Sequence, residues 1–183
     1  MARLPYLKRA DLKAEHQDLL TRNISLYRAL AHSPDALRAF SALGSHIRHR
    51  SRLDPRLREM AILQVGYLER SPYEYSHHVE IGREFGVSDD DIRAIGEETQ
   101  GRPTSLDPLA KAVLHAAWEM TIGLAISERT FAELRRRLDS EQLTDLVLTI
   151  AFYNAVVRIL ATLQIDVEDD YLKYLDEFPL PKD

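Results

Sequence analysis

The sequence predicts an all-α protein, and three observations carry this prediction. Apolar residues recur three and four positions apart along several segments, and a proline follows Ser or Asp where these segments begin. Apolar–polar alternation with a period of two is absent, as are the turn dipeptides that mark hairpins. A chain of 183 residues is long enough to bury one sizeable core, so we expect a single domain over residues 1–183.

The N-terminal part is expected to hold two helices. Apolar residues keep helical spacing over residues 11–31, which predicts the first of them. Ser33-Pro34-Asp35 then provides an N-cap, a proline in the first turn and an acid suited to the positive end of the helix dipole. The second helix that it opens continues through Ile47.

The middle of the chain predicts two buried helices and a shorter one. Asp54-Pro55 opens the first, and its run Met60–Leu68 is almost entirely apolar, so this helix should be buried on several sides. Ser71-Pro72 opens the second, which Gly86 ends as a C-cap. Ser88, followed by three aspartates, caps the short third helix.

The C-terminal half continues with helices after a polar linker. Residues 101–107 form the one extended polar stretch between periodic segments. Helices are expected near residues 108–122, 128–138, 141–163 and 167–178.

A weak internal repeat relates the two halves. The run Leu57–Leu63 parallels Leu143–Thr149, and Tyr67 then falls opposite Tyr153. Two interpretations stay open, a duplicated pair of helices and a chance likeness between amphipathic helices.

Composition limits the classes of function. A net charge of −5 argues against general nucleic-acid binding, and the basic residues around 48–58 and 135–137 are expected to form a solvated face or a subunit contact. No secretory signal and no continuous apolar run that would span a bilayer stand out, so we expect a cytoplasmic protein that binds no membrane. The absence of cysteine excludes disulfides, thiolate metal sites and thiol nucleophiles.

Two adjacent histidines differ in their expected surroundings. His78 lies on the same helical stripe as Tyr75 and Val79, whereas His77 lies on a charged face and is expected to point to solvent. Glu74 is one helical turn before His78, so a carboxylate and an imidazole should be neighbours.

Glu59 completes the candidate catalytic group. It precedes the apolar run, where burial would raise the proton affinity of its carboxylate, and with His78 and Glu74 it could form a general acid–base centre. The alternative is structural: Glu74 and His78 only stabilise their helix, and Glu59 bonds backbone or an arginine. Candidate substrate-binding tyrosines are Tyr67, Tyr73 and Tyr75.

Arg158 is a further candidate for substrate binding because it interrupts an apolar helix and could hold a carboxylate. The alternative interpretation is that Arg158 forms a buried salt bridge to an acid such as Glu59 or Asp145. No HExxH motif is present and the two adjacent histidines face different ways, so neither a metal nor another cofactor is expected.

The spacing of these residues resembles a known family. Glu59, the step to Ser71, the run Tyr73–His78, and the glycines at 82 and 86 are similar to the carboxymuconolactone decarboxylase and alkylhydroperoxidase-D-like (AhpD-like) family. The resemblance covers about residues 35–100, and residues 105–178 would complete the bundle. It implies an AhpD-like helical fold that forms homo-oligomers, as dimers, trimers or hexamers.

The resemblance also implies what this chain is unable to do. The peroxidase branch of the family uses a glutamate, a Cys-x-x-Cys pair and a histidine, which fall here on Glu59, on Ser71 and Glu74, and on His78. Serine and glutamate do not cycle between thiol and disulfide, so thiol-dependent peroxidase activity is excluded.

The decarboxylase branch implies loss of carbon dioxide from a carboxylated lactone, for which an acid–base pair suffices. We therefore expect a cofactor-free lyase for a small lactone or carboxylate. In this expectation His78 is the principal acid–base group, Glu59 is its partner and Glu74 orients it. The alternative is an inactive oligomeric binding or scaffold protein.

Overall fold

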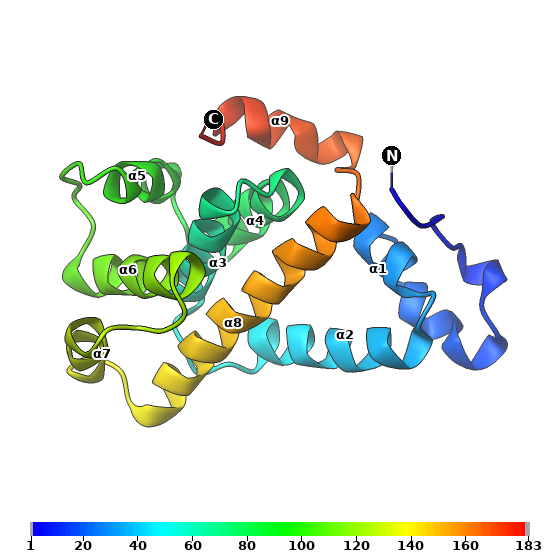
Figure 1. Ribbon diagram of the computed structural model, residues 1–183, viewed down its shortest axis with the longest axis horizontal. Helices are drawn as coiled ribbons and strands as arrows, with labels where there is room; N and C mark the ends of the chain where they lie inside the picture. Colours follow the sequence, from blue (N-terminus) through cyan, green and yellow to red (C-terminus); the bar gives the residue numbers. More distant parts are fainter. Residues whose placement is uncertain (1, 182–183) are drawn as a thin grey trace.

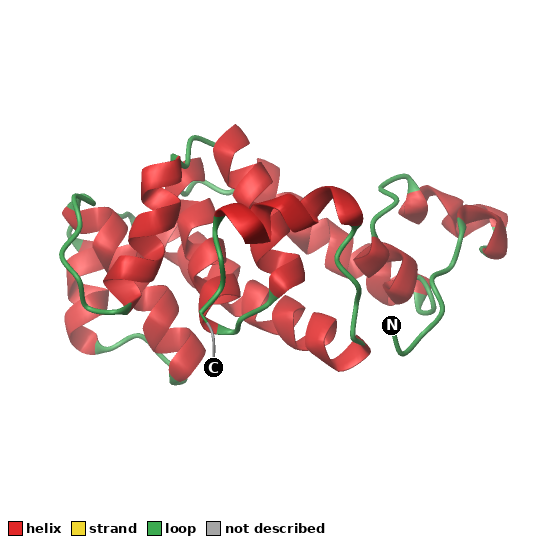
Figure 2. Ribbon diagram, turned by 90° about the horizontal axis from the view of Figure 1, so that it is seen from above, coloured by secondary structure: helices red, strands yellow, loops and turns green. Residues whose placement is uncertain are grey.

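The computed structural model describes residues 2–181, and the elements of that part are all helical (Figure 1, Figure 2). Two short 3-10 helices, η1 and η2, precede the α-helices. Helix η1 spans Arg9–Asp11 and η2 spans Ala14–Leu20. The α-helices are α1 Ser25–Leu30, α2 Pro34–His49, α3 Pro55–Leu68, α4 Pro72–Glu84, α5 Asp89–Thr99, α6 Pro108–Ile122, α7 Glu128–Arg135, α8 Ser140–Leu163 and α9 Asp169–Glu177. The predicted all-α class is confirmed.

Helix α3 is the centre of the fold. Its residues from Leu57 to Tyr67 are all buried, and it packs against α4, α5, α6 and α8. An apolar helix surrounded in this way loses water on every side, as its composition predicts. Gly66 allows α4 to approach, because a Cβ at this position would lie 3.3 Å from the backbone N and Cα of Tyr75.

The predicted N-caps Asp54 and Ser88 form their side-chain bonds, whereas Ser33, the predicted cap of α2, forms no side-chain hydrogen bond to its helix. The Asp54 carboxylate accepts a hydrogen bond from the Leu57 N–H over 3.1 Å, and Ser88 forms a capping box with Asp91. Gly86 follows the end of α4 with a φ of +90°, a backbone conformation that glycine adopts without strain.

The single helix predicted over residues 11–31 is wrong. The segment instead forms η1, η2 and the short α1, with bends between them. Distant side chains fix the start of α1. The Ser25 N–H donates to the Glu168 carboxylate over 2.7 Å, and the Leu26 N–H donates to the Tyr73 hydroxyl over 3.3 Å. Tertiary contacts therefore override the local periodicity.

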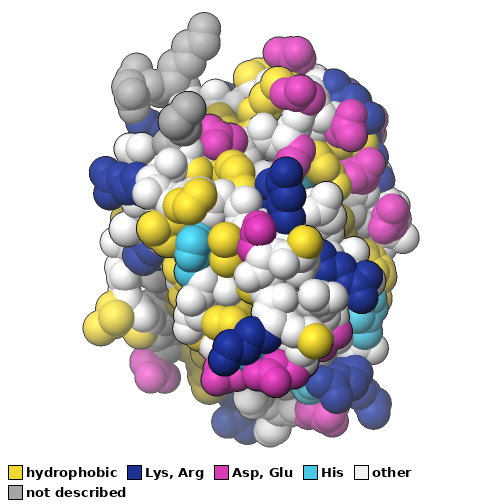
Figure 3. Space-filling view, turned by 90° about the vertical axis from the view of Figure 1, so that its right-hand side faces the viewer, with side chains coloured by type: hydrophobic (Ala, Val, Ile, Leu, Met, Phe, Trp, Pro, Cys, Tyr) yellow, Lys and Arg dark blue, Asp and Glu magenta, His cyan; other side chains and the backbone are white. Residues whose placement is uncertain are grey.

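Some buried residues of the N-terminal segment form a small hydrophobic cluster apart from the main core, to which Leu26 and Ala29 of α1 belong. Leu19 and Leu20 of η2 pack there with Ala31 and with Leu37 of α2. On the face of the molecule at this end, acidic, basic and hydrophobic side chains are interspersed (Figure 3).

Helix α8 runs diagonally across the molecule between the N-terminal segment and the α6–α7 pair (Figure 1). By length and composition it is the one helix in residues 2–181 that could cross a membrane, with a mean hydropathy of 1.9 over its most apolar window. In this structure α8 packs against α3, α4, α6 and α7. The chain folds as a helical domain in which α8 shares the core.

Candidate active site

Helices α3 and α4 bring the three predicted catalytic residues together. Glu74 and His78 are one turn apart on α4, and the His78 Nε2 lies 3.0 Å from the Glu74 Oε1. The His78 Nδ1 lies 2.6 Å from Oε2 of Glu59, which α3 supplies. All three residues are buried, with exposed fractions of 1% for Glu59, 3% for His78 and 4% for Glu74.

Arg58 extends this group into the interior. Its Nε donates a hydrogen bond to the second oxygen of Glu59 over 3.0 Å, and its guanidinium carbon lies 4.5 Å from the centre of the Phe85 ring. The alternative interpretation of Glu59 as a partner of an arginine therefore also holds. Two carboxylates and two cations alternate along the buried chain Glu74–His78–Glu59–Arg58.

The alternating charges set the protonation states of this chain. Burial alone would lower the pKa of His78, but the adjacent Glu59 and Glu74 carboxylates outweigh it and raise this pKa. Burial would raise the pKa of Glu59, but the His78 and Arg58 charges lower it. The imidazolium form of His78 is thus favoured, with an N–H directed at each carboxylate.

A cavity of about 530 Å³ lies on one side of this chain. Glu74 and His78 form part of its wall, whereas Glu59 and Arg58 lie behind them. The remaining wall comes from η2, α1, α2, α8 and other residues of α4, and from the residues that join η2 to α1. This lining includes Asp18, Arg22, Leu26, Tyr27, Arg38, Phe40, Arg48, His49, Tyr73, His77, Ile81, Phe152, Tyr153 and Val156. The volume is within the range of small-molecule sites.

The predicted substrate-binding residues divide between the cavity and other places. Tyr73 lines the cavity and donates its hydroxyl to Glu168. Tyr67 and Tyr75 are buried in the core beside each other and contribute nothing to the cavity wall. Arg158 lies at the surface, where it bonds Asn154 and Glu69 and neither Glu59 nor Asp145.

The prediction that His77 points to solvent is wrong. Its ring is buried and stacked between the rings of Tyr73 and Tyr171, at centroid distances of 4.2 and 3.6 Å. Its Nε2 lies 2.8 Å from the Glu168 carboxylate. Helix α9 covers this face of α4, and the helical period of α4 alone gives no information about that cover.

Two residues of the site escaped the sequence reasoning. The Tyr153 ring packs edge-on against the His78 ring at 5.0 Å, and burial together with the Glu74 and Glu59 charges raises the pKa of the Tyr153 hydroxyl. Arg48, in the last turn of α2, lines the cavity and acts in the opposite direction on the pKa of Tyr153. The pairing of Tyr67 with Tyr153 in the internal repeat was the one available signal for Tyr153.

Among residues 2–181, no group of three or more His, Asp or Glu side chains has the geometry of a metal site. The arrangement can hold and transfer a proton at the cavity wall, because the imidazolium of His78 and the carboxylate of Glu74 exchange one proton between them.

Comparisons with known proteins agree with this fold and this spacing. Residues 34–119 match the model of the carboxymuconolactone decarboxylase family. No match was found among curated proteins.

Several solved structures are similar to the chain. One is an uncharacterised peroxidase-related protein with an alkylhydroperoxidase AhpD core from Ralstonia eutropha, at 20% identity and a TM-score of 0.81 over 98% of each chain. Another is a variant of the debrominase Bmp8 in complex with 2,3,4-tribromopyrrole, at 18% identity and a TM-score of 0.81 over 97% of this chain and 100% of that one. A third is a peroxidase-related protein from a Silicibacter species, at 20% identity and a TM-score of 0.73 over 92% of each chain.

At these identities the likeness shows the shared fold. Residues 34–119, somewhat less than half of the chain, thus resemble the carboxymuconolactone decarboxylase family, and the full sequence contains no cysteine.

Proposed function

We propose that this chain is a cofactor-free acid–base enzyme of the lyase type, acting on a small lactone or related carboxylate. The observation that carries the proposal is the buried chain of Arg58, Glu59, His78 and Glu74, which ends at the wall of a cavity of about 530 Å³. A perturbed, charge-paired histidine beside a cavity is a typical acid–base arrangement.

The residues divide the work by their place relative to the cavity. Glu74 and His78 line it and would exchange a proton with the substrate. Glu59 lies behind His78, holds its Nδ1 and so acts as a positioning residue. Arg58 balances the charge of Glu59.

Decarboxylation at this site needs no electron acceptor. The carbon–carbon bond to the departing carboxylate breaks, and its electron pair moves onto carbon and into the conjugated lactone carbonyl. Carbon dioxide leaves, and the proton shared by His78 and Glu74 is added to carbon. The proton is then regained from solvent. Sulfur is not required, in agreement with the glutamate that stands at the second cysteine position of the peroxidase branch.

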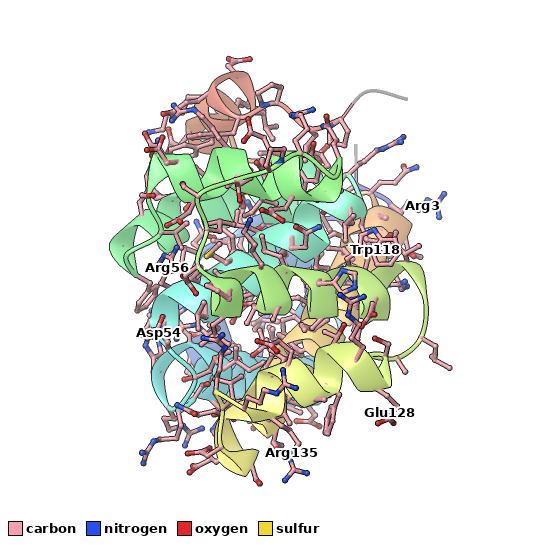
Figure 4. The ribbon with its side chains drawn as sticks, turned by 90° about the vertical axis from the view of Figure 1, so that its left-hand side faces the viewer. Arg3, Asp54, Arg56, Trp118, Glu128 and Arg135 are labelled. Carbon is pink, nitrogen blue, oxygen red and sulfur yellow. The ribbon has the colours of Figure 1, made fainter. Side chains whose placement is uncertain are left out.

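The second candidate is an oligomeric binding or scaffold protein, and a specific surface favours self-association. Large apolar side chains are exposed around the end of α6 and on α7, including Trp118, Ile122, Leu124 and Phe131. Trp118 lies on the outer side of α6 (Figure 4). We propose that this face packs against a second copy, in a dimer or larger homo-oligomer in the cytoplasm. Such an assembly is compatible with the enzyme.

A substrate panel tests the enzymatic proposal. Carbon dioxide release from carboxylated lactones is measured for the wild type, His78→Ala and Glu74→Gln, with His115→Ala as the matched control. His115 forms a similar pair with the acid one turn later, Glu119, but at the surface of α6. Loss of turnover in the two site variants, with wild-type rates in the control, supports the proposal. A lactone consumed equally by wild type and His78→Ala removes His78 from the mechanism.

A further inference from the structure

The charges that line the cavity do not balance. Besides histidines, the wall contains two acids and three arginines. Asp18 neutralises Arg38, with a shortest N–O distance of 2.8 Å, and Glu74 is paired with His78. Arg22 and Arg48 remain, and neither lies within ion-pair distance of a carboxylate of residues 2–181. A cavity with a net positive wall in a chain of net charge −5 calls for an anionic occupant.

Of the two unpaired arginines of the wall, Arg48 is the one whose charge reaches a neighbour of His78. Arg48 is half-buried at the C-terminal end of α2, and its charge lowers the pKa of the Tyr153 hydroxyl. The ring of Tyr153 in turn packs against His78. Arg48, Tyr153 and His78 all line the same cavity. Arg22 is exposed, close to the ring of Tyr27.

Aromatic side chains supply much of the apolar wall. Phe40 of α2 and Phe152 of α8 pack against each other with ring centroids 4.9 Å apart, and three tyrosines lie on the same lining. The faces and edges of such rings favour a flat, apolar partner. The volume of about 530 Å³ is ample for one ring with substituents.

We propose that Arg48 binds the carboxylate of a single-ring organic anion in this cavity and so selects the substrates that reach Glu74 and His78. Arg22, at the exposed side of the wall, attracts such anions toward the cavity. This inference rests on the proposed function, because it concerns the same site and names its substrate class.

The carboxylate held by Arg48 is the one that stays on the substrate. A guanidinium stabilises a bound carboxylate through charge-assisted hydrogen bonds, which opposes loss of that same group as carbon dioxide. The bond that breaks therefore belongs to a different substituent of the ring, on the side of Glu74 and His78.

Equilibrium binding tests the inference without turnover. Benzoate and benzamide have the same ring and nearly the same shape but differ in charge, and their dissociation constants are measured by calorimetry. We expect the wild type to bind benzoate at least about tenfold more tightly than benzamide, the size of one charge-assisted hydrogen bond. Arg48→Gln should abolish this preference, and Arg48→Lys should keep part of it.

Arg50→Gln is the matched control, because Arg50 is exposed two residues farther along the chain and is not part of the cavity lining. It should keep the preference for benzoate. Unchanged affinity for benzamide shows that Arg48→Gln is folded with its cavity intact. An equal preference in wild type and Arg48→Gln overturns the inference, as does a wild type that shows none.

Turnover by the wild type separates this inference from the proposed function. If the wild type prefers benzoate and Arg48→Gln does not, yet the wild type turns over no substrate of the panel, the anion site stands and the lyase proposal fails.

Discussion

Replacing Glu59 by Gln tests the buried charge chain most directly. The substitution keeps the shape of the side chain and removes one negative charge between His78 and Arg58. His78 keeps Glu74 and can release its proton, but Arg58 stays charged with an exposed fraction of 2%. Removal of one partner from a buried ion pair costs roughly 3–5 kcal/mol, and the neutralisation of His78 places this case near 3 kcal/mol.

The assay is unfolding by urea at constant pH. With an m value of about 2.5 kcal/mol per molar, a loss of about 3 kcal/mol lowers the midpoint of the Glu59→Gln variant by about 1.2 M. The matched control is Glu69→Gln at the C-terminal end of α3, whose partner Arg158 is exposed. Such a surface pair contributes less than about 1 kcal/mol. A Glu59→Gln midpoint equal to that of the wild type or of the control refutes the reasoning.

The stabilisation that charged His78 contributes to the fold depends on pH with a definite sign. The pKa of His78 is raised in the folded state, since its two carboxylates outweigh the burial that alone would lower it. Its contribution to stability is therefore complete below the unfolded pKa of about 6.5 and is lost as the pH rises through the folded pKa. In the Glu59→Gln variant, His78 has one carboxylate fewer, so its contribution to stability should be lost at lower pH than in the wild type. Ring-nitrogen NMR of His78 should show an imidazolium in the wild type near neutral pH.

Three further predictions concern other parts of the molecule. Burial alone would raise the pKa of Glu168, but His77 and the Ser25 N–H lower it to about 2, so its stabilisation is present above about pH 4.5 and is lost toward pH 2. Glu168→Gln should cost roughly 1–2 kcal/mol at neutral pH and flatten this acid dependence in urea titrations; an unchanged profile contradicts it. Gly66→Ala should lower the free energy of unfolding by roughly 1–3 kcal/mol, and with it the melting temperature, because the new Cβ would contact the Tyr75 backbone. A higher melting temperature would show that α4 moves to make room for the Cβ. Recombinant protein should reduce no peroxide at the expense of a dithiol beyond a heat-denatured sample.

The parts of the fold that the sequence predicts well depend on local chemistry. The helices opened by Asp54, Ser88 and Asp107 begin as expected, because each cap bonds a backbone N–H two or three residues away. The segment 11–31 and His77 were misjudged for a common reason. Both depend on Glu168, which is 91 residues from His77 in the chain.

The candidate site shows the same division. Glu74 and His78 share a helix, so their contact follows from the helical period. Glu59 was proposed because it precedes the apolar run of α3, and the structure places its carboxylate 2.6 Å from His78. Arg48 comes from α2 and Tyr153 from α8, and no local pattern relates either of them to α4. Arg158 was chosen because it interrupts an apolar helix, but the interruption falls on a side of α8 that faces solvent.

The hydrophobic cluster around Leu19, Leu20 and Leu37 has a consequence for ligand exchange. It shares no buried residue with the main core, yet the segment that carries it forms one side of the cavity. Only partly buried residues, Tyr27, Leu30 and Phe40, pack against both clusters. We therefore expect η2 to open locally more readily than α3, and such an opening would let a small molecule enter and leave the cavity. Amide protons around Leu19 and Leu20 should then exchange with deuterium earlier than those of α3.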